Sequence, residues 1–240
     1  MPHKVISSII ALVFLVLIQT TSKVFRFLLP VMLLYFIVVM AYNYWYLKKH
    51  NFYVFWSWLR MLFFLASIVS IYFVIPSGFI KGIFLIFASA FVYFLELRLL
   101  IASEQVLFFE TLLSYFGLAL GIFGNNYYLL PKNFITLILL GLATYLIARA
   151  SFDYAPQSRQ QKNFFAWFIA FCVLEVSWAL IFLPFHFTVL AVILFNIFYV
   201  LWIITYYHLF HNLSMKKVSF HMIFSTILIL LTLLSTPWKI

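Results

Sequence analysis

Long apolar runs alternate with short polar interruptions along the whole chain. Nine runs are long enough to cross a bilayer as helices, since a transmembrane helix needs about 20 mostly apolar residues. They cover residues 5–21, 24–47, 52–75, 78–101, 105–124, 132–149, 163–183, 186–209 and 217–236. The runs are apolar around the whole helix, as a bundle in lipid requires. This pattern predicts an all-α fold, a polytopic transmembrane helical bundle of about nine spans.

Composition supports this interpretation. Of 240 residues, 67% are hydrophobic and 8% are charged, and the mean hydropathy is +1.15, whereas a soluble domain is about half apolar. The longest polar interval is Arg149–Lys162, which is too short for a soluble domain. We therefore expect residues 1–240 to form a single integral-membrane domain with no soluble domain. The first run lacks a small-x-small cleavage site, so we expect it to be retained as a helix.

Prolines recur at intervals of 46, 55, 53 and 53 residues. Proline lacks an N–H and has a fixed φ, so it suits the first turn of a helix. We interpret the first four prolines as tight turns between an odd-numbered helix and the next even-numbered one. The bundle would then consist of four proline-turn helical hairpins plus a final helix. The five positions are Pro30, Pro76, Pro131, Pro184 and Pro237.

The net charge of +10 reflects Lys and Arg residues dispersed at the ends of apolar runs. Such dispersion does not fit a nucleic-acid partner, which would need a gathered basic surface. Nine of these residues fall on the side opposite the proline turns and five on the proline side. The positive-inside rule then places the N-terminus in the cytoplasm and the C-terminus outside. We expect a bacterial or archaeal cytoplasmic membrane.

Ionisable residues inside a span cost roughly 2.5–3.5 kcal/mol at the helix centre. Arg60 and Glu175 lie well inside their runs, at depths of roughly 12–17 Å from the cytoplasmic side. A buried Arg60–Glu175 pair is a geometric option. Its alternative is that the two residues only fix helix packing. The remaining acids of the spans and their neighbour Arg98 lie near run ends, where we expect interfacial anchors: Glu96, Glu104 and Glu110.

Two fragments, Phe182-x-x-x-His186 and His208-x-x-x-Asn212, resemble parts of the motifs of CAAX-type intramembrane proteases. The paired glutamates and following arginine of that family are absent. His186 and His208 would also lie roughly 33 Å apart on one helix, too far to share a metal. We therefore predict no metal site, no cofactor and no catalytic residues. The single cysteine, Cys172, forms no intramolecular disulfide.

The leading functional hypothesis is a small permease or channel-like protein with a polar interior, because buried ionisable groups in spans commonly mark a substrate or proton path. The expected partners are the lipid bilayer and a small-molecule or ion substrate. One alternative is a non-catalytic accessory subunit that binds other membrane subunits. A membrane-embedded lipid-modifying enzyme is the other. A polar cavity reaching Glu175 would favour transport. The candidate buried polar site consists of Arg60, Glu175, Asn196, Ser57, Ser67 and Ser177.

Overall fold

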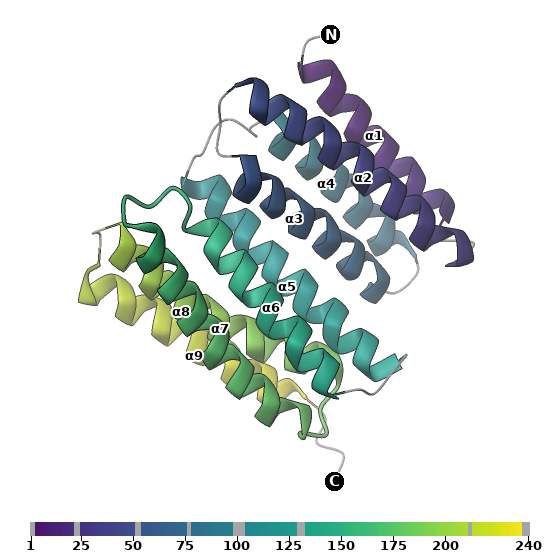
Figure 1. The fold of residues 1–240 in the computed structure, drawn as a ribbon. Helices are drawn as coiled ribbons and strands as arrows, with labels where there is room; N and C mark the ends of the chain where they lie inside the picture. Colours follow the sequence, from purple (N-terminus) through teal and green to yellow (C-terminus); the bar gives the residue numbers. More distant parts are fainter. Residues whose placement is uncertain are drawn as a thin grey trace. The chain divides into compact units, whose positions relative to one another are not determined.

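The computed structural model describes residues 3–21, 25–50, 54–75, 78–97, 104–128, 133–210 and 213–236. This described part of the chain forms nine helices and no strand (Figure 1). The helices are α1 (His3–Thr21), α2 (Phe25–Lys49), α3 (Val54–Val74), α4 (Phe79–Leu97), α5 (Glu104–Tyr128), α6 (Asn133–Ser151), α7 (Arg159–Ile181), α8 (Phe187–Leu209) and α9 (Met215–Ser235). Each helix corresponds to one predicted run, and each is long and apolar enough to cross a membrane. The predicted fold class is therefore confirmed.

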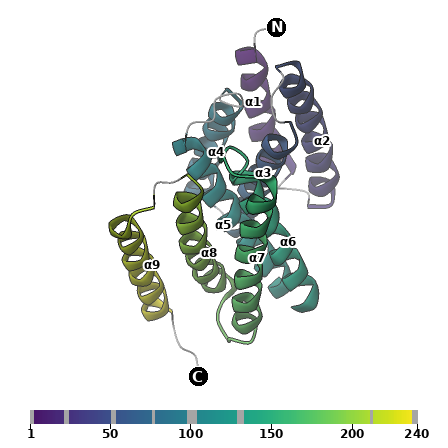
Figure 2. The same ribbon diagram turned by 60° about the vertical axis from the view of Figure 1, so that its left-hand side comes forward.

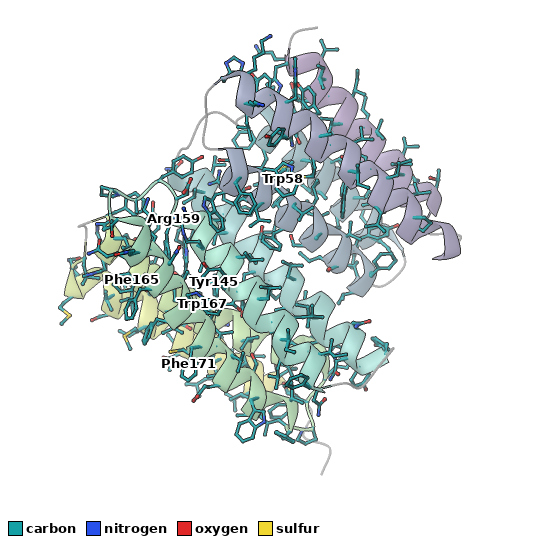
Figure 3. The ribbon with its side chains drawn as sticks, in the orientation of Figure 1. Trp58, Tyr145, Arg159, Phe165, Trp167 and Phe171 are labelled. Carbon is teal, nitrogen blue, oxygen red and sulfur yellow. The ribbon has the colours of Figure 1, made fainter. Side chains whose placement is uncertain are left out.

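The chain divides into two compact units, Met1–Glu110 and Thr111–Ile240. We call them the first and the second unit. In the first unit, α1 and α3 each pack against both α2 and α4, so that the four helices enclose a common core. Fully buried apolar side chains fill this core, including Phe14, Phe64 and Val92. The indole Nε1 of Trp58, labelled in Figure 3, donates a hydrogen bond to the carbonyl of Met40 and ties α3 to α2.

In the second unit, α6 packs on α7, α7 on α8, and α8 on α9. Figure 2 shows α8 and α9 running side by side. The core is aromatic: Tyr115 and Phe198 stack with ring centroids 3.7 Å apart, and Trp202 is fully buried. Helix α9 adds little to this core, because Ser225 is the buried residue within its bounds. Most of α9 therefore presents an apolar surface suited to lipid.

The proline prediction holds only in part. Pro184 lies in the connection between α7 and α8, as a turn between helices requires, although it precedes the first turn of α8. Pro30 instead lies inside α2, where the missing N–H leaves the carbonyl of Arg26 without its intrahelical donor. The interpretation of Pro30 as a turn was wrong, because α2 begins earlier, at Phe25. The other three prolines fall outside the described residues: Pro76, Pro131 and Pro237.

Local chemistry explains the start of α7, which lies four residues before the predicted run. The Ser158 side chain accepts a hydrogen bond from the backbone of Gln161, whose side chain accepts one from the Ser158 backbone. This capping box satisfies two backbone donors that a helix start leaves open. At the start of α4, Gly78 has a φ of 131°, a conformation that glycine adopts without a steric penalty.

Candidate functional site: a buried polar layer

Polar side chains gather at one end of the first unit, where α1 and α3 begin, α2 and α4 end, and α5 begins. Asn43, Arg60 and Glu110 each lie six residues from the nearer end of their helix, or about 9 Å at the rise of an α-helix. We call this set of six residues the polar layer: His3, Tyr42, Asn43, Arg60, Glu96 and Glu110.

Glu96 and Asn43 form the centre of the polar layer. Both side chains have an exposed fraction of 0%. Asn43 Nδ2 donates a hydrogen bond of 2.9 Å to Glu96 Oε1, which joins α2 to α4. The second oxygen of each group, Glu96 Oε2 and Asn43 Oδ1, is buried without a hydrogen-bond partner. Buried polar atoms of this kind are rare in native proteins and call for an explanation.

His3 fixes the helix ends around this centre. Its Nε2 lies 2.7 Å from the carbonyl oxygen of Glu96, and its Nδ1 lies 2.9 Å from the Tyr42 hydroxyl. A carbonyl accepts only, so Nε2 carries the proton, and in the neutral ring Nδ1 then accepts from Tyr42. The imidazole also stacks on Tyr46, with centroids 3.9 Å apart. One side chain thereby connects α1, α2 and α4.

Arg60 and Glu110 form the charged part of the polar layer. Arg60 Nε lies 3.9 Å from Glu110 Oε2, within ion-pair distance but longer than a hydrogen bond. Glu110 and Glu96 are 7% and 0% exposed, so their expected role as interfacial anchors was wrong. Sequence position gave their depth along the helix, but not the direction in which they point. Arg98 and the side chain of Glu104 lie outside the described residues.

The predicted site residues fall in different places. Glu175 is exposed on α7, which corrects the expectation of a buried acid there, and the acid beside Arg60 in its own unit is Glu110. Ser67 and Ser177 are fully buried, and each hydroxyl donates to a carbonyl of its own helix. Ser57 is also buried.

Asn196, the last predicted site residue, joins α8 to α9. It is 1% exposed, and its Nδ2 donates to the carbonyl of Val192. Ser225 donates to both the carbonyl and the side-chain oxygen of Asn196, at 3.3 Å each. These bonds give Asn196 a part in the packing of α9 on α8.

A second polar network lies in the connection from α6 to α7. Arg149 is 3% exposed, and its Nε donates a 2.6 Å hydrogen bond to Asn163. Its guanidinium also pairs with Asp153 at 3.5 Å, while Lys162 Nζ donates to the Asp153 carbonyl. Beside it, the rings of Tyr145 and Trp167, both labelled in Figure 3, stack 4.3 Å apart. These contacts stabilise the connection between α6 and α7.

The second unit also contains a cavity of about 760 Å³ at the α7–α8 connection. Its polar lining comes from Asn126, His186, Thr188, Ser235 and Thr236, and the rest is mainly aromatic and aliphatic. Its size lies in the range of small-molecule sites. Glu175 is not one of its lining residues, so the cavity does not provide the path to Glu175 that would have favoured transport.

The two histidines of the protease-like fragments lie as predicted, at opposite ends of one helix. His186 caps the N-terminus of α8 by accepting from the Thr188 N–H, and His208 lies in the last turn. Within the described ranges, no group of three or more His, Cys, Asp or Glu side chains is placed to hold a metal ion. Comparisons of the chain with protein-family models, curated proteins and solved structures found no match. The nine apolar helices of the described residues thus define the class of protein, a multi-pass membrane protein.

Proposed function

We propose that this protein is a small permease or channel-like protein whose transport path passes through the polar layer of the first unit. The observation that carries the proposal is the burial of two carboxyl groups, Glu96 and Glu110, inside membrane-spanning helices. Ionisable groups at such positions are costly, and in membrane proteins they mark substrate, ion or proton paths. Arg60 beside Glu110 adds a third ionisable group to the same layer.

A flux assay tests this proposal. The purified protein is reconstituted into vesicles that contain a pH-sensitive dye, and proton entry is followed after an external acid pulse with potassium and valinomycin present. We expect flux above that of empty vesicles, and at least a tenfold loss in Glu96→Gln and Glu110→Gln. Ser8→Ala, a change at a partly exposed residue of the same unit whose hydroxyl bonds to the carbonyl of Lys4, controls for reconstitution. Wild-type flux in both Gln variants would overturn the proposed path.

The proposed orientation places the N-terminus in the cytoplasm of a bacterial or archaeal cell. It rests on the Lys and Arg excess opposite the proline positions. Fusion of alkaline phosphatase after Lys81 is then expected to be active, and fusion after Lys49 inactive. The reverse pattern would overturn the orientation.

An accessory-subunit function is the second candidate, and the surface of α9 supports it. Within its bounds α9 buries Ser225, while apolar side chains such as Phe220, Ile223 and Leu234 are exposed. A partner helix would cover this surface as well as lipid does. Absence of flux, together with a stable larger complex in detergent extracts of the native membrane, would favour this candidate.

A further inference from the structure

Glu96 and Asn43 each have one side-chain oxygen without a hydrogen-bond partner. Asn43 Nδ2 donates to Glu96 Oε1, and this leaves Glu96 Oε2 and Asn43 Oδ1 buried without partners. An ionised carboxylate accepts only, and so does the amide oxygen. Two acceptors are therefore buried, and no donor among the described residues bonds to either of them, an arrangement that buried groups avoid.

We infer that the Glu96–Asn43 pair is a proton-binding site, in which Glu96 Oε2 carries a proton and donates it to Asn43 Oδ1. One proton converts one of the two unmatched acceptors into a donor for the other. The carboxylic acid and the amide then form two parallel hydrogen bonds, each donating one and accepting one. The inference deepens the proposed function and rests on it only for the role of this proton in transport.

The surrounding charges favour protonation at Glu96 over Glu110. Glu110 has Arg60 as a cationic neighbour, whereas no ion pair among the described residues includes Glu96. The two carboxyls are close enough to repel each other electrostatically when both are charged. From α2, the Tyr35 hydroxyl donates to the carbonyl of Ile10 and the Tyr42 hydroxyl bonds to His3 Nδ1, so neither hydroxyl is the missing donor.

The contact from α1 contributes no charge to the carboxyl group. His3 donates to the backbone carbonyl of Glu96 and not to its side chain. Among the described residues, none of these neighbours of Glu96 therefore forms an ion pair with its carboxylate. A proton also suits the pair better than a metal ion, because Ca²⁺ or Mg²⁺ takes six or more oxygen ligands, and two unmatched oxygens fall far short of that.

Infrared spectroscopy of the detergent-purified protein at neutral pH tests the site. We expect a carbonyl band of a protonated carboxylic acid that shifts to lower frequency in D₂O. The band should disappear in Glu96→Gln and persist in Glu110→Gln. In Asn43→Leu, which keeps Glu96 but removes its acceptor, the band should move to higher frequency. Circular dichroism confirms that each variant is helical.

Three outcomes would overturn the site. They are absence of the band in wild type, its persistence in Glu96→Gln, and its loss in Glu110→Gln. The infrared and flux results together distinguish a failure of the proton site from a failure of the transport path. A band with the expected pattern combined with undiminished proton flux in both Glu96→Gln and Glu110→Gln supports the proton site while the proposed path fails. Flux that is lost in Glu96→Gln without any band overturns the site and leaves the path intact.

Discussion

In the second unit the buried charge of Arg149 is matched by groups nearby in sequence, whereas in the first unit Glu96 and Glu110 find their neighbours on distant helices. Arg149 contacts Asp153 and Asn163, four and 14 residues away. Asn43 and Glu96 are 53 residues apart. A local network forms with the turn that contains it, while a distant one requires the assembled helices.

The two regions also differ in the hydrogen bonds that they complete. Arg149 donates to a neutral amide and to a carboxylate, and the turn around it is closed by Lys162. These bonds are sufficient to account for a stable connection between α6 and α7. The Glu96 pair leaves one acceptor on each partner unmatched although both side chains are fully buried. The Arg149 network therefore has a structural role, whereas the Glu96–Asn43 pair is suited to take up a proton.

The largest expected effect concerns the charge pair of the first unit. Arg60→Met should lower the free energy of unfolding by about 3–5 kcal/mol, because it leaves the buried Glu110 carboxylate without its cationic neighbour. Denaturant titration of the detergent-purified protein measures this. Replacing both residues, as Arg60→Met with Glu110→Leu, should recover much of the loss, since an apolar pair of similar volume is often nearly neutral. A double variant less stable than either single one would contradict the pairing.

A smaller loss is expected in the core of the second unit. Trp202 Nε1 donates a 2.7 Å hydrogen bond to Ser151, and both side chains are 0% exposed. Trp202→Phe removes that donor from a buried hydroxyl and should cost about 1–3 kcal/mol in the same titration. Trp178→Phe makes the same chemical change at an indole that is 60% exposed, and it should have a clearly smaller effect. Equal losses in the two variants would show that the buried bond contributes little.

The sequence predicted the helices well because a transmembrane span depends on length and composition, which are local properties. It did not predict the polar layer. Counting residues from the helix end gave the depth of Glu96 and Glu110, but a helix that is apolar all round carries no signal for which side faces the protein. Glu175 was favoured because it lies near mid-span, yet it is exposed.

A third prediction concerns the attachment of α9 within the second unit. Ser225→Ala deletes the hydroxyl that donates to the carbonyl and side-chain oxygens of Asn196, and it should cost about 0.5–1.5 kcal/mol, the usual net worth of such a bond. Ser235→Ala on the same helix removes a hydroxyl that donates to the carbonyl of Thr232 within α9. It serves as the matched control, and it should change the titration midpoint less than Ser225→Ala. The reverse order would show that α9 is not attached through Asn196.

The smallest expected effect is that of Glu175→Gln. Glu175 is exposed on α7, so the change removes no buried charge and leaves no buried cation unmatched. Glu110→Gln makes the same chemical change beside Arg60 and should lower the melting temperature of the purified protein, because the guanidinium loses an acidic neighbour in a buried site. Thermal melts of the two variants, collected side by side in one detergent, therefore rank the two acids directly. A loss in Glu175→Gln as large as that in Glu110→Gln, cancelled when Arg60→Met is added, would show that Glu175 is the acid that Arg60 requires. It would restore the pair predicted from the sequence, and Glu110 and Glu175 would no longer differ as partners of Arg60.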